Sequence, residues 1–249
     1  MSESKYFKFT NSVVVAPLIG VILIWAVFWL ELRFHMNLNE YGVFPRTLKG
    51  LRGVFFSPFI HGSVEHLYNN TIPLAILTAS LFYFYKRVSL KVLIYGVLLS
   101  GILTWFIGRP SYHIGASGII YVLASFTFFK GIFSKYYRLV ALSLIVVFIY
   151  GSLLWYIFPI KDEISWEGHL GGFITGLVMA LFIKAETPSS KKFDWEHENY
   201  NEEADEFLKH FDEAGNFIET KADEVKQEAD SLKITYQYRP NEKREHPED

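Results

Sequence analysis

Six long apolar stretches divide the first 185 residues, and they constrain the fold more than any other feature. A helix that crosses a bilayer needs about 17–25 mostly apolar residues, because no water satisfies its backbone within the hydrocarbon. By this rule the sequence predicts transmembrane helices at 13–32, 67–85, 90–107, 117–129, 139–158 and 168–183. The fourth and sixth are short, which leaves a re-entrant segment open as an alternative for one of them. We expect an all-α, polytopic membrane protein built as a six-transmembrane-helix bundle.

The composition agrees with this class, since 51% of the residues are hydrophobic and 18% are aromatic. The chain has no cysteine, which excludes disulfides, thiolate nucleophiles and cysteine-ligated metal centres. Lys5 and Lys8 precede the first apolar stretch, as in a signal peptide. That stretch is long enough to span a bilayer and lacks a convincing small-residue cleavage site, so we expect a retained first helix.

Charge divides the chain into a basic body and an acidic tail. The formal charge is +8 up to Ala185 and −10 from Glu186 onward. We therefore expect a short cytoplasmic N-terminus (1–12), a membrane domain (13–185) and an acidic cytoplasmic tail (186–249) that is disordered or amphipathic helical. A partner for this tail in the cytoplasm is one interpretation, and a plain solvated tail is the other. An acidic tail gives no support for nucleic-acid binding.

The basic residues of the short loops predict the orientation. Most of them fall on one side of the bundle if both termini are cytoplasmic, in keeping with the positive-inside rule. The exception is a first loop of about 30 residues with four basic side chains, which suggests a structured element. We therefore expect a multi-pass protein located in the plasma (cell inner) membrane.

Three polar clusters begin three of the predicted helices, and polar groups at membrane depth are expensive enough to suggest function. The first contains His61, His66 and Asn70, of which the last two are four residues apart and share a helix face. An imidazole and a carboxamide on one face could stabilise a developing oxyanion. Hydrogen bonding between helices is the simpler alternative.

The second cluster is Gly115-Ala116-Ser117-Gly118, at the start of the fourth predicted helix. A serine before a helix is usually only an N-cap. Free N–H groups and the positive end of the helix dipole would also favour a negatively charged intermediate there. Tyr121 lies four residues on and shares the face of Ser117.

The third cluster, Glu167-Gly168-His169-Leu170-Gly171-Gly172, begins the sixth predicted helix. Gly168, Gly172 and Gly176 form a smooth stripe that allows close approach of another helix. If that helix is the one beginning at Ser117, the hydroxyl and the His169 imidazole come within hydrogen-bond reach, as an activated nucleophile requires.

As a set, the His-x4-His-x3-Asn, Gly-Ala-Ser-Gly and Gly-His-Leu-Gly-Gly motifs resemble those of the rhomboid intramembrane serine proteases over about residues 10–185. The resemblance implies a nucleophile Ser117 and a general base His169, a dyad without an aspartate. It also implies oxyanion stabilisation by His66, Asn70 and the Ser117 N–H.

The resemblance also implies three supporting residues. Gly115 would allow close approach before the nucleophile, His61 would hold water and loop geometry, and Tyr121 would pack against the His169 ring. Neither a cofactor nor a metal is implied. The implied substrates are membrane proteins whose transmembrane segment unwinds easily. Some members carry a Trp-Arg pair in the first loop; here the sequence leaves Arg46 and Arg52 as candidates for its structural role.

Three other functions compete with the protease. A catalytically inactive rhomboid-like protein that binds membrane clients would typically lack the serine or the histidine, and this chain has both. A zinc site formed by His61, His66 and His169 is disfavoured because His61 and His66 are five residues apart, rather than the four that share a helix face. A transporter is the weakest alternative, since no pair of matching broken helices suggests inverted repeats.

Overall fold

The computed structural model describes residues 9–135, 137–149, 155–161 and 164–185, and in the tail residues 193, 195, 198–205, 207–212 and 214–218. The chain divides into two compact units, 1–190 and 191–249. Within the described residues, regular structure is helical and the only β-pairings are two isolated bridges. The all-α class expected from the sequence is confirmed.

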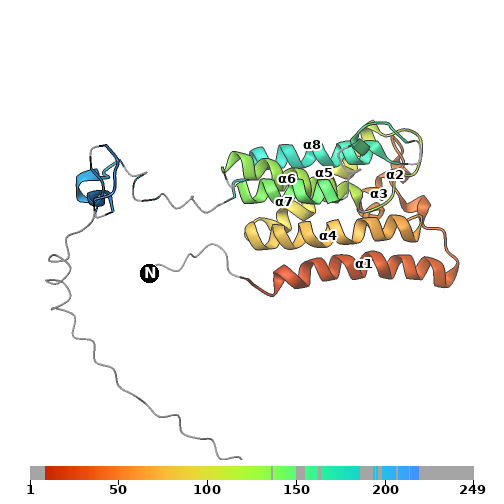
Figure 1. The fold of residues 1–249 in the computed structure, drawn as a ribbon. Helices are drawn as coiled ribbons and strands as arrows, with labels where there is room; N and C mark the ends of the chain where they lie inside the picture. The colour runs from red at the N-terminus through yellow and green to blue at the C-terminus, as the bar shows by residue number, and fades with distance from the viewer. Residues whose placement is uncertain are drawn as a thin grey trace, which may run out of the picture. The chain divides into compact units, whose positions relative to one another are not determined.

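Eight α-helices lie in the described part of the first unit (Figure 1). In chain order they are α1 (Ser12–Phe34), α2 (Leu48–Leu51), α3 (Gly53–Phe56), α4 (Val64–Phe84), α5 (Ser89–Ile107), α6 (Ser117–Phe133), α7 (Tyr137–Ile149) and α8 (Trp166–Phe182). The six long ones begin within three residues of the expected starts. α1 and α5 are long and apolar enough to cross a membrane, and α6 is a shorter apolar helix.

The fifth predicted helix differs from the expectation at its end. α7 is described as far as Ile149, and a 3₁₀ turn at Trp155–Ile157 stands where the sequence predicts α-helix up to residue 158. Residues 150–154 of this prediction lie outside the described residues. Apolar composition does not distinguish a helix from an apolar turn, and the turn proves important for the site.

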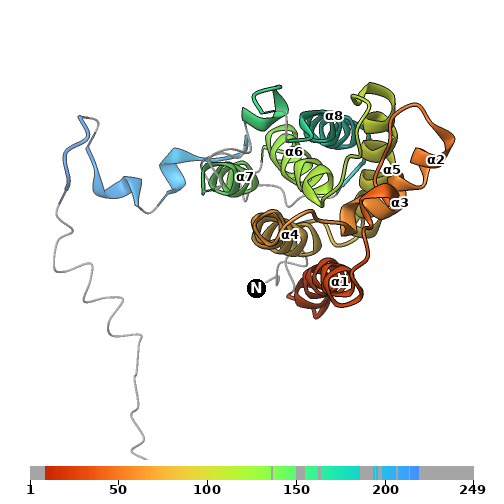
Figure 2. The ribbon, with the colours of Figure 1, turned by 90° about the vertical axis from the view of Figure 1, so that its right-hand side faces the viewer.

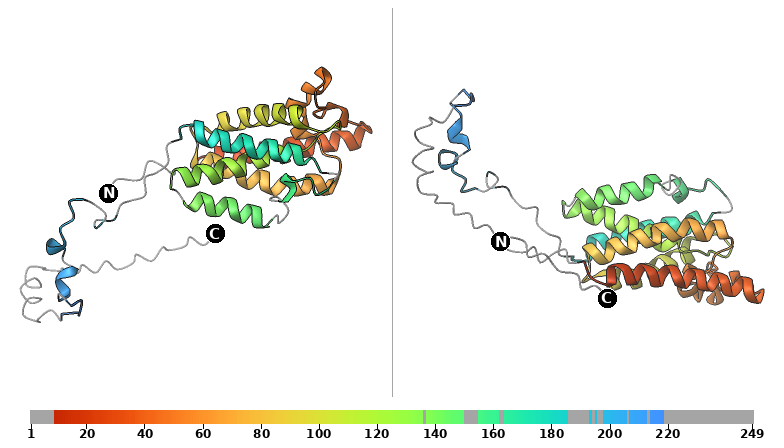
Figure 3. Two further views of the ribbon diagram at one scale, coloured as in Figure 1. Left: turned by 90° about the horizontal axis from the view of Figure 1, so that it is seen from above. Right: turned by 60° about the horizontal axis from the view of Figure 1, so that its bottom comes forward.

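α6 is the central helix of the bundle. Seen from the end, it lies among α4, α5, α7 and α8, whereas α1 packs on the outer side of α4 (Figure 2). In the right-hand view of Figure 3, α1 again lies at the edge of the bundle beside α4. An apolar helix buried on all sides is expected at such a position, and the residues of α6 at 119–127 are all buried.

Glycines set how closely α8 approaches α6. A Cβ built on Gly172 would lie 2.2 Å from the carbonyl oxygen of Gly118, and one on Gly176 would lie 2.4 Å from that of Val122. Gly168 differs from the other two, since its nearest neighbour is the Ser165 side chain at 2.9 Å. Two glycines of the predicted stripe therefore form the contact with α6, a pair that we call the glycine seam.

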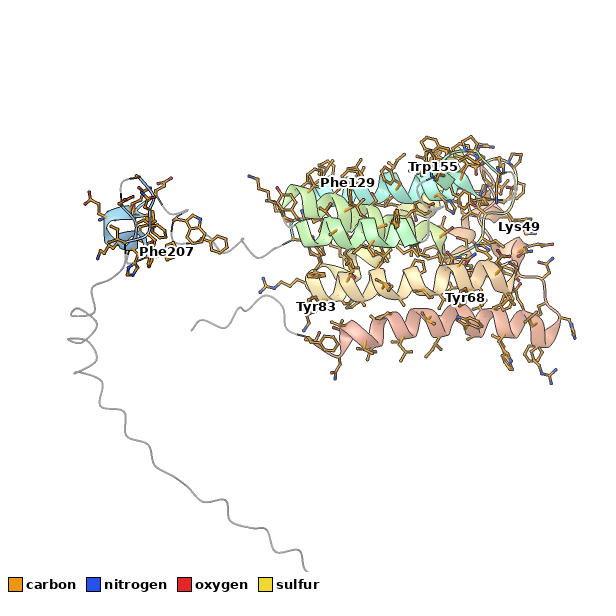
Figure 4. All side chains as sticks on the ribbon, in the orientation of Figure 1. Lys49, Tyr68, Tyr83, Phe129, Trp155 and Phe207 are labelled. Atoms are coloured by element: carbon orange, nitrogen blue, oxygen red, sulfur yellow. The ribbon has the colours of Figure 1, made fainter. Side chains whose placement is uncertain are left out.

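The first loop is structured, as expected, and it lies at one end of the bundle against α5. Besides α2 and α3 it contains 3₁₀ turns at Asn39–Tyr41 and Ser57–Phe59. In Figure 4, Lys49, Tyr68 and Trp155 lie toward this end of the bundle, and Tyr83 and Phe129 lie toward the other. We call these the loop end and the opposite end.

The two candidate arginines of this loop have different contacts. Arg46 Nη1 donates hydrogen bonds to the carbonyls of Phe106 (3.1 Å) and Gly108 (2.9 Å), at the end of α5. Arg52 Nη2 donates to the carbonyl of Glu40, and its guanidinium lies 4.2 Å from the centre of the Tyr41 ring. Arg46 therefore ties the loop to α5, whereas these contacts of Arg52 stay within the loop.

The described part of the tail forms 3₁₀ turns at Glu202–Ala204 and Leu208–His210. The Asp212 carboxylate accepts hydrogen bonds from the backbone N–H groups of Ala214 and Asn216. Phe207 and Phe217 are exposed. An amphipathic α-helix is thus absent from 198–205, 207–212 and 214–218. Apart from residues 193 and 195, the rest of the predicted tail (186–249) lies outside the described residues.

Candidate active site

Three long helices begin at the loop end, and their N-termini carry the three polar clusters. Ser117 is the first residue of α6, His169 lies in the first turn of α8, and His66 lies in the first turn of α4. The Ser63 and Ser165 hydroxyls cap α4 and α8 by accepting from the N–H groups of His66 and Gly168. The local sequence therefore starts these helices where the polar side chains can meet.

The Ser117 hydroxyl and the His169 imidazole are in direct contact. Ser117 Oγ lies 2.9 Å from His169 Nε2, and His169 Nδ1 lies 2.9 Å from the carbonyl oxygen of Tyr156. Because a carbonyl can only accept, Nδ1 must carry the hydrogen, and Nε2 is then left to accept from the serine. This is the arrangement that a nucleophile and its general base require.

Two tyrosines orient the His169 ring. The Tyr121 ring stacks on it, with 4.4 Å between the centroids and 18° between the planes. Tyr156 contributes its backbone carbonyl from the 3₁₀ turn at Trp155–Ile157. In a continuous α-helix the N–H four residues later would take this carbonyl. The sequence analysis missed Tyr156, and no sequence signal reveals it, since any residue type can supply a carbonyl.

His66 and Asn70 face the loop that leads into Ser117. Gly115 has a φ of +106°, and a Cβ built on it would lie 2.6 Å from His66 Nε2 and 3.7 Å from Asn70 Nδ2. Both the left-handed backbone and the close approach of the imidazole therefore require glycine here. Asn70 is buried and donates to the carbonyl of His66 at 3.0 Å, which leaves its second amide hydrogen available.

His61 contacts the same loop at Ala116, the residue after Gly115. Its Nε2 accepts from the N–H of Ala116 at 3.3 Å, and its Nδ1 faces the carbonyl of Phe59 at 3.4 Å. Burial, with a smaller contribution from His66, lowers the pKa of His61 to about 4, which keeps the ring neutral and Nε2 an acceptor. Both nitrogens therefore contact protein groups.

A pocket of about 420 Å³, part of it open to solvent, adjoins Ser117. It lies between the first loop, α5 and the beginnings of α6 and α8, and its polar lining includes Ser57, Ser100, Thr104, His113, Ser117 and Ser165. Although most of the lining is apolar, polar groups beside a serine hydroxyl can hold the water that a hydrolysis consumes.

Comparisons with known proteins find a matching family and several relatives. A family model described as the Rhomboid domain matches residues 49–186. An uncharacterized protein of Mycobacterium tuberculosis (Rv1337) is 33% identical over 176 residues, which cover 66% of this chain and 72% of that protein. An uncharacterized protein of Mycobacterium leprae (ML1171) is 31% identical over 185 residues, which cover 69% of this chain and 71% of that protein.

Proposed function

The chain belongs to the rhomboid family, and we propose that it is an intramembrane serine endopeptidase that cleaves substrates at transmembrane segments with a Ser117–His169 dyad. The observation that carries the proposal is the 2.9 Å contact between Ser117 Oγ and His169 Nε2, with Nδ1 held by the Tyr156 carbonyl. This contact combines a nucleophile, a base and an orienting group in one chain of hydrogen bonds.

In the proposed reaction, His169 Nε2 takes the proton of Ser117 as Oγ attacks a peptide carbonyl. The resulting imidazolium then gives this proton to the leaving amine, so that the C–N bond breaks and an acyl-enzyme remains. Water from the pocket beside Ser117 hydrolyses the ester, with His169 acting again as base and then as acid. The Tyr121 ring and the Tyr156 carbonyl keep the imidazole in position throughout.

The oxyanion of each tetrahedral intermediate is stabilised by three donors in this proposal. They are the Ser117 N–H at the first turn of α6, the Asn70 amide and the His66 imidazole. The N–H groups of a first helical turn have no partner within the helix. The Ala116 N–H is already used by His61 and is therefore not a fourth donor.

The proposed topology has six membrane-spanning helices, α1, α4, α5, α6, α7 and α8, with both termini in the cytoplasm of a cell whose inner membrane holds the protein. The distribution of basic loop residues and the two clearly apolar helices support it. Because the chain has no cysteine, single introduced cysteines can be tested for reaction with impermeant reagents from either side. Labelling of loop residue Leu48 only from the outside would support this orientation.

The proposed substrates are membrane proteins with a transmembrane segment that unwinds readily, since an extended peptide must reach Ser117. The acidic tail, with Phe207 and Phe217 exposed, is a candidate for binding a cytoplasmic partner. We expect removal of residues after Lys192 to leave peptide-bond hydrolysis intact.

The test is reconstitution with a generic single-span substrate, comparing wild type, Ser117→Ala and His169→Ala. Cleavage by the wild type alone is expected, because both residues act in the same step and losing either removes it. Cleavage that persists in both variants would contradict the dyad. If no form cleaves, a fluorophosphonate probe that reacts with activated serines distinguishes a protease of narrow specificity, which is labelled at Ser117, from an inactive client-binding relative, which is not.

A further inference from the structure

The nucleophile and the base are 52 residues apart in the sequence, so something must fix the segments that carry them relative to each other. Ser117 follows loop 108–116, which connects α5 to α6, and His169 follows the first residues of α8. The glycine seam fixes the two helices further along. At the loop end itself the connection is made by polar side chains of Arg109, His113, Ser165 and Glu167.

Glu167 is the least expected member of this group. It is buried to 1% exposure in the first turn of α8, next to Gly168 and His169. Its Oε1 accepts from the backbone N–H of Arg109 at 3.1 Å and lies 3.8 Å from Arg109 Nε. No residue in the described part of the chain donates to Oε2, which is buried as well. A buried carboxylate is costly, and Ser165 already caps this helix, so capping does not account for it.

Arg109 and His113 complete the connection from the side of the loop. Arg109 Nη2 donates to the carbonyl of Ile164 at 2.8 Å, just before α8. His113 Nε2–H donates to the carbonyl of Arg109 at 3.1 Å, so its Nδ1 accepts from the Ser165 hydroxyl at 2.6 Å. Burial lowers the pKa of His113, which keeps the ring neutral for this role.

The first loop holds the other side of the same segment. Val43 and His113 exchange two backbone hydrogen bonds, of 3.0 and 2.9 Å. Loop 108–116 is therefore held between the first loop and the N-terminus of α8. The residue at which it is held, His113, lies four residues before the nucleophile.

We propose that Glu167 is a positioning residue for the dyad: with Arg109, and beside the His113–Ser165 hydrogen bond, it holds loop 108–116 against α8 and so sets the distance between Ser117 Oγ and His169 Nε2. The kinetic part of its test rests on the proposed protease activity, whereas the distance measurement does not. A misplacement of a catalytic group by about 1 Å can cost about 10²-fold in rate. The contacts of Glu167 can therefore affect turnover although Glu167 does not touch the substrate.

The kinetic test compares Glu167→Ala, Glu167→Gln and Glu40→Gln. Glu167→Ala is expected to lower kcat by about 10²-fold with KM unchanged within about twofold. Glu167→Gln should recover most of this loss, because its amide oxygen still accepts from the Arg109 N–H. Glu40→Gln removes the carboxylate of an exposed ion pair with Lys49 in the first loop and should have no effect.

The second measurement is the distance between two spin labels, one at Ser111→Cys in the loop and one at Val178→Cys on the exposed face of α8. With no native cysteine, only these two positions are labelled. The distance distribution should be narrow with Glu167 present and should broaden or shift in the Glu167→Ala background, but not in the Glu40→Gln background.

Unchanged kcat in Glu167→Ala would overturn the inference. So would a loss that follows only the fraction of folded protein while the label distance stays the same, because Glu167 would then serve stability alone. If wild type cleaves nothing, the proposed function fails first, and the label distance still decides whether Glu167 positions the loop. If Glu167→Ala does not fold, the same comparison is made with Glu167→Gln, for which a smaller change in the same direction is expected.

Discussion

The middle and the loop end of the α6–α8 contact are built in opposite ways. In the middle, Gly172 and Gly176 bring two backbones together so closely that not even a methyl group fits between them. At the loop end the backbones are farther apart, since a Cβ on Gly118 would be 3.7 Å from its nearest neighbour. There the two helices are joined by the hydrogen bond between the Ser117 and His169 side chains. The seam determines how far apart the helices are, and at that separation the Ser117 and His169 side chains meet at the polar end.

This difference implies that the two regions should respond differently to substitution. Changes at the polar end should affect turnover more than stability, since its side chains carry the proposed chemistry and each hydrogen bond lost there costs about 1 kcal/mol. Changes in the seam should affect both, because overpacking moves whole helices.

The largest effect on rate short of the dyad is expected from Asn70→Ala. Losing one donor of the proposed oxyanion hole should cost about 10²–10³ in kcat, while losing the hydrogen bond to the His66 carbonyl should lower the free energy of unfolding by only about 1 kcal/mol. Steady-state kinetics and thermal unfolding in detergent measure the two quantities. The matched control is Asn69→Ala, one residue earlier on the exposed face of α4, which should behave as wild type.

Gly172→Ala should lower both kcat and the free energy of unfolding. The new methyl group would meet the Gly118 carbonyl oxygen at 2.2 Å, so α6 and α8 must separate. Overpacking of this kind costs about 1–3 kcal/mol of stability, and a displaced dyad should cost up to about 10²-fold in kcat. Gly62→Ala is the control, because its Cβ would meet only a side-chain carbon at 3.7 Å. Normal activity with reduced stability would show that the seam does not set the dyad distance.

His61 should make the stability of the loop end depend on pH. Its folded pKa of about 4 lies below the unfolded value of 6.5, so the unfolded state binds more protons between these values. Its contribution is therefore complete above about pH 6.5 and is lost as the pH falls toward 4, by at most about 3 kcal/mol. The free energy of unfolding, measured against pH, should lack this pH-dependent contribution in His61→Gln, whose amide oxygen can still accept from the Ala116 N–H. If wild type and His61→Gln lose stability in parallel between about pH 6.5 and about pH 4, the assignment to His61 is wrong.

The smallest effect on activity is expected at the opposite end of the bundle. Lys130 Nζ donates to the carbonyls of Ala180 (3.1 Å) and Ile183 (2.7 Å), at the end of α8. Lys130→Met keeps the aliphatic part and loses both hydrogen bonds, so stability should fall by about 1 kcal/mol with kcat unchanged within about twofold. A loss of kcat as large as that of Gly172→Ala would mean that the two ends are not separable.

The sequence predicts the helical elements well where the signal is local. α6 begins at Ser117 as expected, because polar residues and glycine precede a long apolar run, and the other long helices begin close to their predicted starts. The meeting of Ser117 with His169 follows from glycines that allow close packing, whereas the contact of Tyr121 with the same ring is implied by the resemblance to rhomboid proteases. These features are visible because they depend on residue type and spacing.

Contacts made by the backbone, or by loops whose geometry is not local, are not visible in this way. The Tyr156 carbonyl is available only because a 3₁₀ turn replaces the predicted helix at Trp155–Ile157. Glu167 and Arg109 are both near motif residues, yet their pairing depends on the path of loop 108–116. A Cβ on Gly168, a member of the predicted stripe, would meet the Ser165 side chain first and not α6, because spacing gives the face of a helix but not what lies opposite it.

The carbonyl behind His169 has a consequence that a carboxylate in its place would not have. A carboxylate takes up a proton in mild acid and then becomes a donor, which would release or invert the ring it orients. The Tyr156 oxygen belongs to an amide and remains an acceptor across the range in which proteins stay folded. The direction in which the imidazole presents Nε2 is thus set by the permanent dipole of the carbonyl. Acidification does not change this carbonyl and so cannot turn the ring by protonating the group that orients it.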